Sequence, residues 1–166
     1  MKLQLITYGC GEKFDPSKFT PIKNIKFVKP EGGLWASPIE SSYGWRDWCR
    51  DESYDGKLSQ YFTFILEGNI YTINNTYDAS CMPWIKEHEW LRCPDFEQMV
   101  KLGYDAIFLT EEGQQKTRFG KPSLYGWDCE SVLILNKEKI LTNRFSGACA
   151  YSAVSTNNVS GVAQAP

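Results

Sequence analysis

The sequence predicts an α+β fold, in which several strands form the framework and a few short helices flank them. Short apolar runs bounded by turn residues recur along the chain, helical periodicity is confined to brief segments, and there is no internal repeat. With 166 residues, 42% of them hydrophobic, the chain is long enough to bury a core. We therefore expect one domain over residues 1–141 and a poorly packed tail over residues 142–166, where Ser, Ala, Asn, Val and Gly follow no period.

In the first half of the chain, apolar runs bounded by Gly and Pro predict strands. These strands are expected at residues 3–8, 25–28, 34–37, 61–66 and 70–73, with the last two joined as a hairpin. One helix is expected over residues 43–51, with Ser41 or Ser42 as its N-cap. Its apolar face consists of Trp45, Trp48 and Cys49.

The second half of the chain begins with residues 74–94, which are irregular apart from a short helix expected at 84–91. Asp95 then begins a helix that Gly103 closes. Its expected apolar face consists of Phe96, Met99, Val100 and Leu102. Strands are expected at residues 104–109 and 132–135, and a polar loop over residues 111–125 separates them.

Composition argues against several classes of partner. The net charge of −2, from 18 basic and 20 acidic residues, lacks the basic excess typical of proteins that bind nucleic acid or anionic membranes. The longest apolar runs fall far short of a membrane span, and the N-terminus is too short and polar for a signal peptide. Six cysteines without a C-x-x-C pair, together with a single His, favour free thiols over a zinc site. We expect a cytoplasmic protein.

Two acidic residues stand immediately before the last predicted strand, in the segment Trp127-Asp128-Cys129-Glu130. Side chains two apart on a strand point to the same face, and two carboxylates beside a buried run are costly unless they bind or catalyse. Asp128 and Glu130 could simply be solvated, or pair with Lys121 or Lys137. Alternatively, one carboxylate stabilises a developing cation or binds ribose hydroxyls while the other polarises a nucleophile, which suits a sugar-transfer site.

Two earlier segments carry weaker signals. In Leu34-Trp35-Ala36-Ser37, a buried Trp and a Ser bonded to local backbone would explain the residues without function. The functional alternative is that Trp35 stacks on a planar ligand ring and Ser37 orients the site. The segment Thr7-Tyr8-Gly9 is, on local grounds, a strand that runs into a turn.

Taken in order, the three segments resemble the motifs of the ADP-ribosyltransferase family, particularly its small single-domain members common in phages and bacteria. In that family an early strand carries His or Arg before an aromatic residue and Gly. A second strand carries an aromatic-x-Ser or Tyr element, and a late strand opens with an acidic pair. The corresponding segments here are Thr7-Tyr8-Gly9, Leu34-Trp35-Ala36-Ser37 and Asp128-Cys129-Glu130. Residues 101–107 and 131–140 resemble the family's C-terminal strand pair, so the resemblance covers about residues 1–140.

The resemblance implies a split β-sandwich of two packed sheets with short flanking helices, and NAD bound as a substrate in the cleft. It implies a transferase of the glycosyltransferase class, which cleaves the nicotinamide–ribose bond and passes ADP-ribose to a macromolecular acceptor. The acceptor would be a protein, and conflict between phage and host is a setting that the resemblance suggests.

Roles for individual residues follow from the resemblance alone. Glu130 would stabilise the ribose cation, Asp128 would position the acceptor, and Ser37 would support Glu130 by a hydrogen bond. The residues implied in binding NAD are Thr7, Tyr8, Gly9, Trp35, Tyr43 and Trp45. In the loop over residues 111–125, Arg118 and Phe119 are the candidates for contact with the acceptor.

Thr7 departs from the family pattern, because its hydroxyl cannot neutralise a phosphate as His or Arg would. Three outcomes remain open: another cation (Lys13, Arg46 or Arg118) takes this role, NAD binds weakly, or catalysis is lost. Two alternatives to the transferase therefore stand beside it. One is a non-catalytic module that binds NAD or blocks a partner, and the other is an NAD glycohydrolase that uses water as the acceptor.

Overall fold

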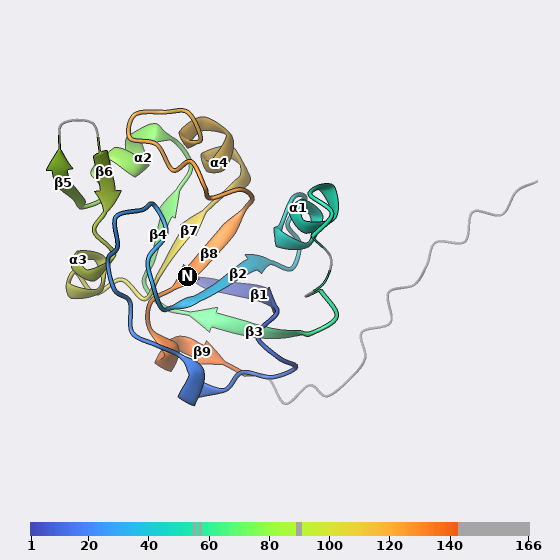
Figure 1. The fold of residues 1–166 in the computed structure, drawn as a ribbon. Helices are drawn as coiled ribbons and strands as arrows, with labels where there is room; N and C mark the ends of the chain where they lie inside the picture. The colour runs from blue at the N-terminus through green and yellow to red at the C-terminus, as the bar shows by residue number, and fades with distance from the viewer. Residues whose placement is uncertain (55, 57, 89–90, 143–166) are drawn as a thin grey trace, which may run out of the picture.

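A computed structural model describes residues 1–54, 56, 58–88 and 91–142. Figure 1 shows a mixed fold, with one large sheet and short helices around its edges, so the predicted α+β class is confirmed. Of the tail expected over residues 142–166, all but residue 142 lies outside the described residues.

Nine strands and four α-helices make up the described part of the chain. The strands are β1 (Lys2–Tyr8), β2 (Leu34–Pro38), β3 (Tyr61–Glu67), β4 (Ile70–Ile73), β5 (Trp84–His88), β6 (Leu91–Pro94), β7 (Ala106–Leu109), β8 (Ser131–Ile134) and β9 (Ile140–Leu141). The α-helices are α1 (Trp45–Asp51), α2 (Thr76–Cys81), α3 (Phe96–Lys101) and α4 (Glu111–Thr117). Single 3₁₀ turns occur at Pro16–Lys18 and Lys137–Lys139.

Seven strands form one sheet in the order β4-β7-β8-β2-β1-β3-β9, and β5 pairs with β6 in a separate hairpin. β4 and β7 run parallel, whereas the other neighbouring strands run antiparallel. Strand β2 changes partner along its length: residues 34–36 pair with β8, and residues 37–38 pair with β1. The sheet therefore consists of two half-sheets joined through β2, in place of two separate sheets.

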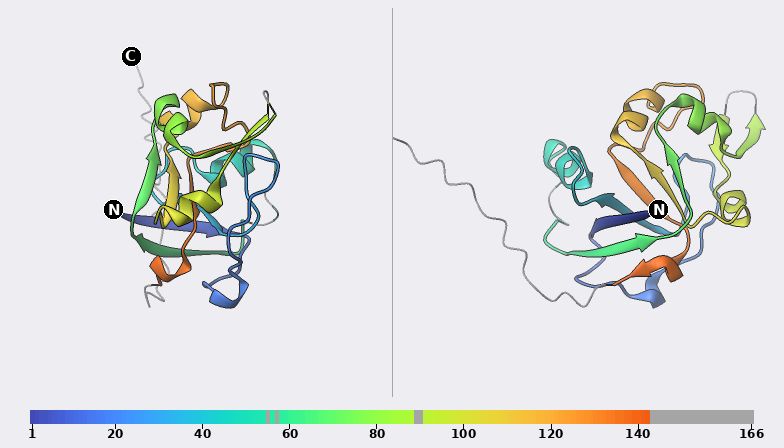
Figure 2. Two further views of the ribbon diagram at one scale, coloured as in Figure 1. Left: turned by 90° about the vertical axis from the view of Figure 1, so that its left-hand side faces the viewer. Right: turned by 180° about the vertical axis from the view of Figure 1, so that it is seen from behind.

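The two half-sheets run in different directions. Figures 1 and 2 show β4, β7 and β8 crossing the direction of β1 and β3 steeply. One apolar cluster joins the half-sheets and contains Leu5, Phe64 and Leu66 from the first together with Phe108, Val132 and Ile134 from the second. Each large side chain buried in this way contributes about 1.5–3 kcal/mol, so this cluster holds the split sheet closed.

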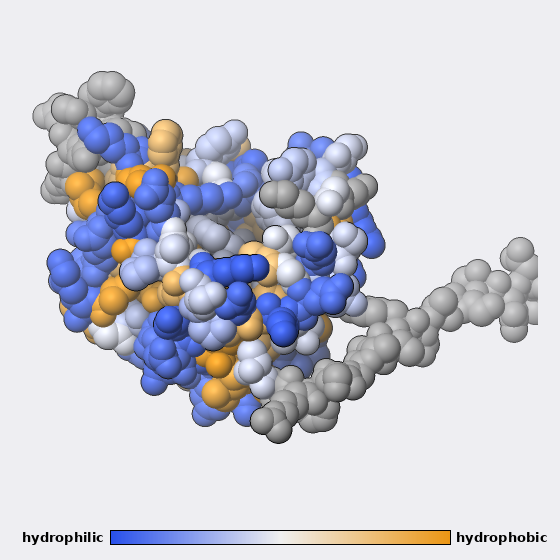
Figure 3. All heavy atoms as spheres, turned by 60° about the horizontal axis from the view of Figure 1, so that its bottom comes forward, coloured by the Kyte–Doolittle hydropathy of each residue, from blue (hydrophilic) through white to orange (hydrophobic). Residues whose placement is uncertain are grey.

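A second apolar cluster covers the opposite face of β7 and β8. It includes Ile107, Leu109 and Leu133 from the strands, with Phe96, Met99 and Trp127 packed against them. Because both faces are covered, every residue of β7 and β8 is buried. On the outside, the face drawn in Figure 3 is largely hydrophilic, with hydrophobic residues in separate small patches.

Helix ends follow ordinary capping chemistry. The side chains of Asp95, Thr110 and Asn75 each accept a bond from a backbone N–H at the start of their helix. Helix α1 differs from the prediction, because its N-cap is Gly44 and neither Ser41 nor Ser42. A Cβ on Gly44 would lie 3.1 Å from the Ser37 Cβ, so a residue without a side chain fits where α1 starts against β2.

Some predicted elements are wrong. Residues 25–28 form no strand, because bends run over residues 26–29, and residues 70–73 form no hairpin with β3 because β4 pairs in parallel with β7. The segment expected as a helix at 84–91 forms the β5–β6 hairpin, whose connecting residues 89–90 are outside the described residues. On α3, Val100 and Leu102 are 44% and 54% exposed, so only the Phe96 and Met99 side of the predicted apolar face is buried.

Two helices were missed by sequence reasoning. α4 occupies the start of the expected polar loop, and α2 lies in a segment expected to be irregular. Both are short and carry acidic residues in their first turns, where the helix dipole favours negative charge.

Candidate functional site

A cavity of about 460 Å³ opens where the two half-sheets separate. Its walls come from the end of β1, from β2, from α1 and from the segment before β8. The cavity lies in the size range of small-molecule sites. Seven of the nine predicted site residues line it: Thr7, Tyr8, Gly9, Trp35, Ser37, Trp45 and Asp128. Tyr43 and Glu130 are not among its lining residues.

Two buried hydroxyl groups explain how β2 changes partner. Where β1 and β2 separate, the Thr7 hydroxyl donates to the Trp35 carbonyl at 2.8 Å. Where β2 and β8 separate, the Ser37 hydroxyl donates to the Glu130 carbonyl at 2.9 Å and accepts from the Trp45 N–H at 3.0 Å. Both side chains are 2% exposed, and these bonds satisfy carbonyls that lose their strand partners. Thr7 and Ser37 thus have structural roles beside the cavity.

The two acidic residues do not share a strand face. β8 begins at Ser131, and residues 129–130 form a bend, so the two-residue alternation of a strand does not apply to Asp128 and Glu130. Asp128 lines the cavity, whereas Glu130 is fixed through its backbone: its N–H donates to the Tyr43 carbonyl at 3.2 Å. The expected contact between Ser37 and Glu130 exists, but through the Glu130 carbonyl.

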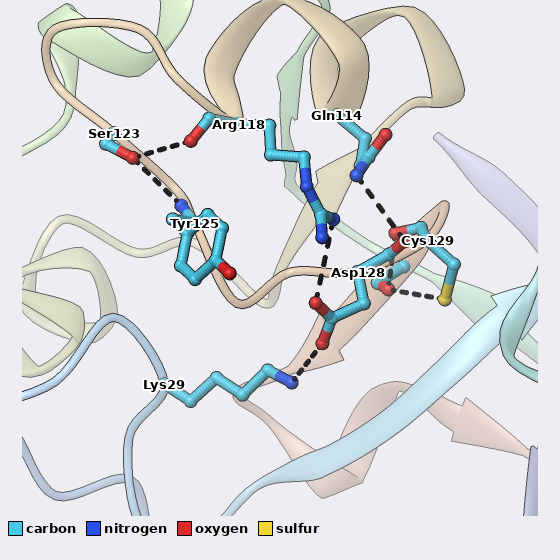
Figure 4. Close-up of polar contacts among 8 residues, drawn as sticks. Lys29, Gln114, Arg118, Ser123, Tyr125, Asp128 and Cys129 are labelled. Carbon is cyan, nitrogen blue, oxygen red and sulfur yellow. Dashed lines mark hydrogen bonds and ion pairs between the residues drawn. The ribbon is translucent and has the colours of Figure 1, made fainter. Parts of the chain in front are cut away.

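Asp128 is the centre of the charged part of the site. The Lys29 Nζ lies 3.3 Å from one carboxylate oxygen, and the Arg118 Nη1 lies 3.6 Å from the other. Figure 4 shows the two cations reaching the carboxylate from different sides. The side chains of Asp128, Arg118 and Lys29 are 20%, 31% and 41% exposed, so all three are partly screened from water.

Lys29 was not identified from the sequence, although it lines the cavity. It is placed by its neighbour: the Val28 carbonyl accepts a 2.7 Å bond from the buried Trp127 indole, and Trp127 directly precedes Asp128. One hydrogen bond between segments 99 residues apart therefore aligns Lys29 with Asp128. The available sequence signal was the turn Lys29-Pro30-Glu31-Gly32-Gly33, which leads directly into β2.

Of the three cations considered in place of Thr7, one lies at this site. Arg118 is not a lining residue of the cavity, but it contacts the lining residue Asp128. Arg46 lies 3.7 Å from Asp47 in α1, and the exposed Lys13 is not a lining residue of the cavity.

Aromatic rings supply much of the remaining wall. Tyr8, Trp35 and Trp45 all line the cavity, and Trp45 stacks on Trp48 with centroids 4.7 Å apart. Trp35 meets Trp127 edge to face at 4.6 Å, which fixes the orientation of its ring. Such walls suit a planar ligand ring.

Tyr43, predicted to stack on the ligand, is engaged elsewhere. Its hydroxyl donates to the Asp51 carboxylate at 2.9 Å, and this bond is the main cause that raises the pKa of Tyr43 to about 12. The side chain ties the loop before α1 to the end of that helix.

Three cysteines also line the cavity, namely Cys10, Cys49 and Cys129. Burial raises the pKa of Cys129 to about 11, so its thiol stays protonated at neutral pH and is a poor nucleophile. Within the described ranges, no group of three or more His, Cys, Asp or Glu side chains is arranged to hold a metal ion. The cavity thus offers aromatic rings, one carboxylate and the Lys29 ammonium group, and Arg118 contacts that carboxylate without being a lining residue itself.

The described residues contain no helix long and apolar enough to cross a membrane. Comparison of the chain with protein-family models, with curated proteins and with solved structures finds no match.

Proposed function

We propose that the protein binds NAD in this cavity, cleaves the nicotinamide–ribose bond and transfers ADP-ribose to a protein acceptor. The observation that carries the proposal is the convergence of three separate segments, residues 7–9, 35–37 and 128, on one cavity. These are the segments whose order resembles the ADP-ribosyltransferase motifs. The split sheet, with its cavity between two packed halves, is also compatible with the fold that the resemblance implies.

The chemistry requires a carboxylate near the ribose. As the C1′–N bond breaks, its electron pair leaves with nicotinamide and positive charge develops on the ribose. A nucleophile of the acceptor then bonds to C1′ and releases its proton. Asp128 is the carboxylate that lines the cavity, so we assign it the role of stabilising the ribose cation. Glu130, two residues away at the bend, is assigned to the acceptor side.

A protein acceptor is supported by the surface beside the charged group. Phe119 and Tyr125 are 82% and 58% exposed, and their rings lie 5.8 Å apart. Arg118 lies near both rings, 5.9 Å and 5.2 Å from their centroids, while also contacting Asp128. Exposed aromatic residues with an Arg are typical of contact sites on proteins.

The first experiment measures nicotinamide release from NAD together with transfer of labelled ADP-ribose to proteins of a cell lysate. We expect wild-type chain to do both. Asp128→Asn should lower release at least about 100-fold, since it removes a preorganised charge that acts in the transition state. Glu130→Gln should reduce transfer more than release.

Three outcomes separate the candidate functions. Release of nicotinamide with free ADP-ribose as the only product would identify a glycohydrolase. Thermal protection by NAD without release would identify a non-catalytic NAD-binding module. If NAD neither protects the wild-type protein nor is cleaved, the proposal is wrong. Glu112→Gln, at an exposed acid on α4, controls for a general effect of losing a carboxylate.

A further inference from the structure

We infer that Asp128 is an internal counter-anion, and that Lys29 and Arg118 form a site that a nucleotide diphosphate takes over from it. The inference rests on the proposed function in so far as the nucleotide is NAD, but the anion site itself is tested separately below. It assigns to Lys29 and Arg118 the neutralising role that Thr7 cannot fill.

The geometry of the three charges points to a replaceable anion. Each cation contacts a different oxygen of the Asp128 carboxylate, at 3.3 Å and 3.6 Å. These separations are longer than the 2.7–2.9 Å of a strong charge-assisted bond, and the ion pairs are partly exposed. A nucleotide diphosphate carries negative charge and free oxygens on both of its phosphates, so its total charge exceeds that of one carboxylate and its two phosphates can contact both cations at shorter distance.

Each cation also has an aromatic contact besides its contact with Asp128. Lys29 lies 5.8 Å over the Trp35 ring, and the Val28 carbonyl beside it is bonded to Trp127. Arg118 lies 5.2 Å from the Tyr125 ring centroid. Because aromatic faces attract cations by their own electrostatics, we expect both groups to remain beside Asp128 when a phosphate displaces the carboxylate.

Charge also favours exchange of the anion. Two positive groups face one negative group, so the three side chains together carry one net positive charge. The neighbouring Cys129 thiol is protonated at neutral pH because burial raises its pKa to about 11, and it adds no compensating charge. An excess cation at the mouth of a cavity attracts an anionic ligand.

Exchange has a consequence for chemistry at this site. When the diphosphate engages Lys29 and Arg118, the Asp128 carboxylate loses both counter-ions. A carboxylate without counter-ions stabilises a developing cation more strongly, since nothing neutralises its field. Binding of a nucleotide diphosphate thus frees the Asp128 carboxylate for the proposed reaction. A ligand without phosphates leaves this carboxylate paired with Lys29 and Arg118.

The test measures binding of ADP, inorganic pyrophosphate and adenosine by calorimetry to the full chain at one low ionic strength. Wild-type protein should bind ADP and pyrophosphate. Adenosine should bind more weakly than ADP, because it lacks the diphosphate. Lys29→Ala should weaken ADP binding about tenfold through loss of a charge-assisted contact. Asp128→Asn should strengthen ADP binding about threefold or more, because the internal competitor is removed.

The sign of the Asp128→Asn effect decides the matter. A purely structural or catalytic Asp128 would leave ADP affinity unchanged or lower it, and either result in a folded variant overturns the inference. Lys116→Ala is the matched control, because Lys116 is an exposed lysine paired with Glu112 and should leave affinity unchanged. Lys29→Ala provides a second test should the Asp128 variant fail to fold, and unchanged ADP affinity there also overturns the inference.

The other ligands identify the anion and separate this inference from the proposed function. Pyrophosphate binding without ADP binding would mean that the site binds free inorganic phosphate compounds. This result would contradict the inference that the ligand is a nucleotide diphosphate. Tighter ADP binding by Asp128→Asn with no cleavage of NAD by wild type would support the anion site and contradict the transferase. Cleavage of NAD by wild type, with no gain in ADP affinity in Asp128→Asn, would support the transferase and contradict the anion site.

Discussion

At the scale of single residues, the polar side chains near the cavity divide into two groups. Thr7 and Ser37 are buried, and their hydroxyls satisfy backbone carbonyls where strands separate. Lys29, Asp128 and Arg118 are partly exposed, and each of the two cations contacts the Asp128 carboxylate. The first group holds the shape of the site, and the second carries charge that a ligand can reach.

Ser37→Ala should therefore lower stability. It removes the partner of the Glu130 carbonyl and of the Trp45 N–H, and a buried group without its partner costs about 1–3 kcal/mol. Denaturant unfolding monitored by Trp fluorescence measures this loss. Ser80→Ala, at an exposed serine, should change stability by less than about 0.5 kcal/mol. Equal stability of the two variants would contradict the structural role of Ser37.

The sequence predicted the cavity residues more fully than it predicted their roles. Asp128 and Trp35 were identified from local cost and from motif order, and both line the cavity. Lys29 was missed, because its approach to Asp128 depends on a hydrogen bond between Val28 and Trp127, far apart in the chain. The position of Glu130 could not be predicted locally either. The prediction assumed that side chains alternate along a strand, but residues 129–130 form a bend before β8 begins.

At the scale of elements, strong local signals gave the correct structure. Strands β1, β3 and β8 form where apolar runs predicted strands. Helix α3 forms between Asp95 and Gly103, the two residues that predicted its ends. The pairing of β3 with β4 failed, because Gly68 and Asn69 resemble a hairpin turn but carry the chain from one half-sheet to the other. Hydrogen bonds between Asn69 and the backbone and side chain of Asp105 place β4 beside β7. The sequence of residues 61–73 alone cannot predict this contact, because its partner lies more than thirty residues further along the chain.

Helix α4 offers a sharp test at this scale. Gly→Ala inside a helix ordinarily stabilises it by about 0.5–1 kcal/mol. At Gly113, however, a Cβ would lie 2.0 Å from the Ile73 carbonyl oxygen, where the helix crosses the end of β4. Gly113→Ala should instead destabilise the protein by about 1–3 kcal/mol in denaturant unfolding.

Gln115→Ala in the same helix is the control for Gly113→Ala, because Gln115 is exposed and should tolerate the change. A stabilised Gly113→Ala variant would show that α4 does not pack as closely on β4 as described.

At the scale of the whole molecule, the buried thiol of Cys129 and the partly buried phenol of Tyr71 contribute to the response of stability to alkaline pH. Burial raises the pKa of Cys129 from 9.0 to about 11 and is the main cause that raises the pKa of Tyr71 from 10.0 to about 12. A folded-state pKa above the unfolded value gives stability that is complete below the unfolded pKa and lost as pH rises through the folded one. The melting temperature should therefore begin to fall above about pH 9.

Cys129→Ala should make this fall shallower between about pH 9 and 11, whatever its effect on stability at neutral pH. Thermal melts at several pH values measure the slope. Cys81→Ala, at an exposed thiol, should retain the wild-type slope. Identical slopes for wild type and Cys129→Ala would contradict the burial of this thiol.

The sharing of β2 between two half-sheets has a consequence for how ligands enter. Because β2 is hydrogen-bonded to β1 at one end and to β8 at the other, the halves cannot separate unless β2 loses its pairing with one of these strands. The cavity is therefore preorganised, and little ordering entropy is lost in its walls when a ligand binds. Discrimination between ligands then depends on the exposed side chains at the cavity entrance. These side chains reorient within nanoseconds, far faster than domains close in proteins that shut around a ligand. Association should accordingly follow a single kinetic phase, set by diffusion and by charge at the entrance.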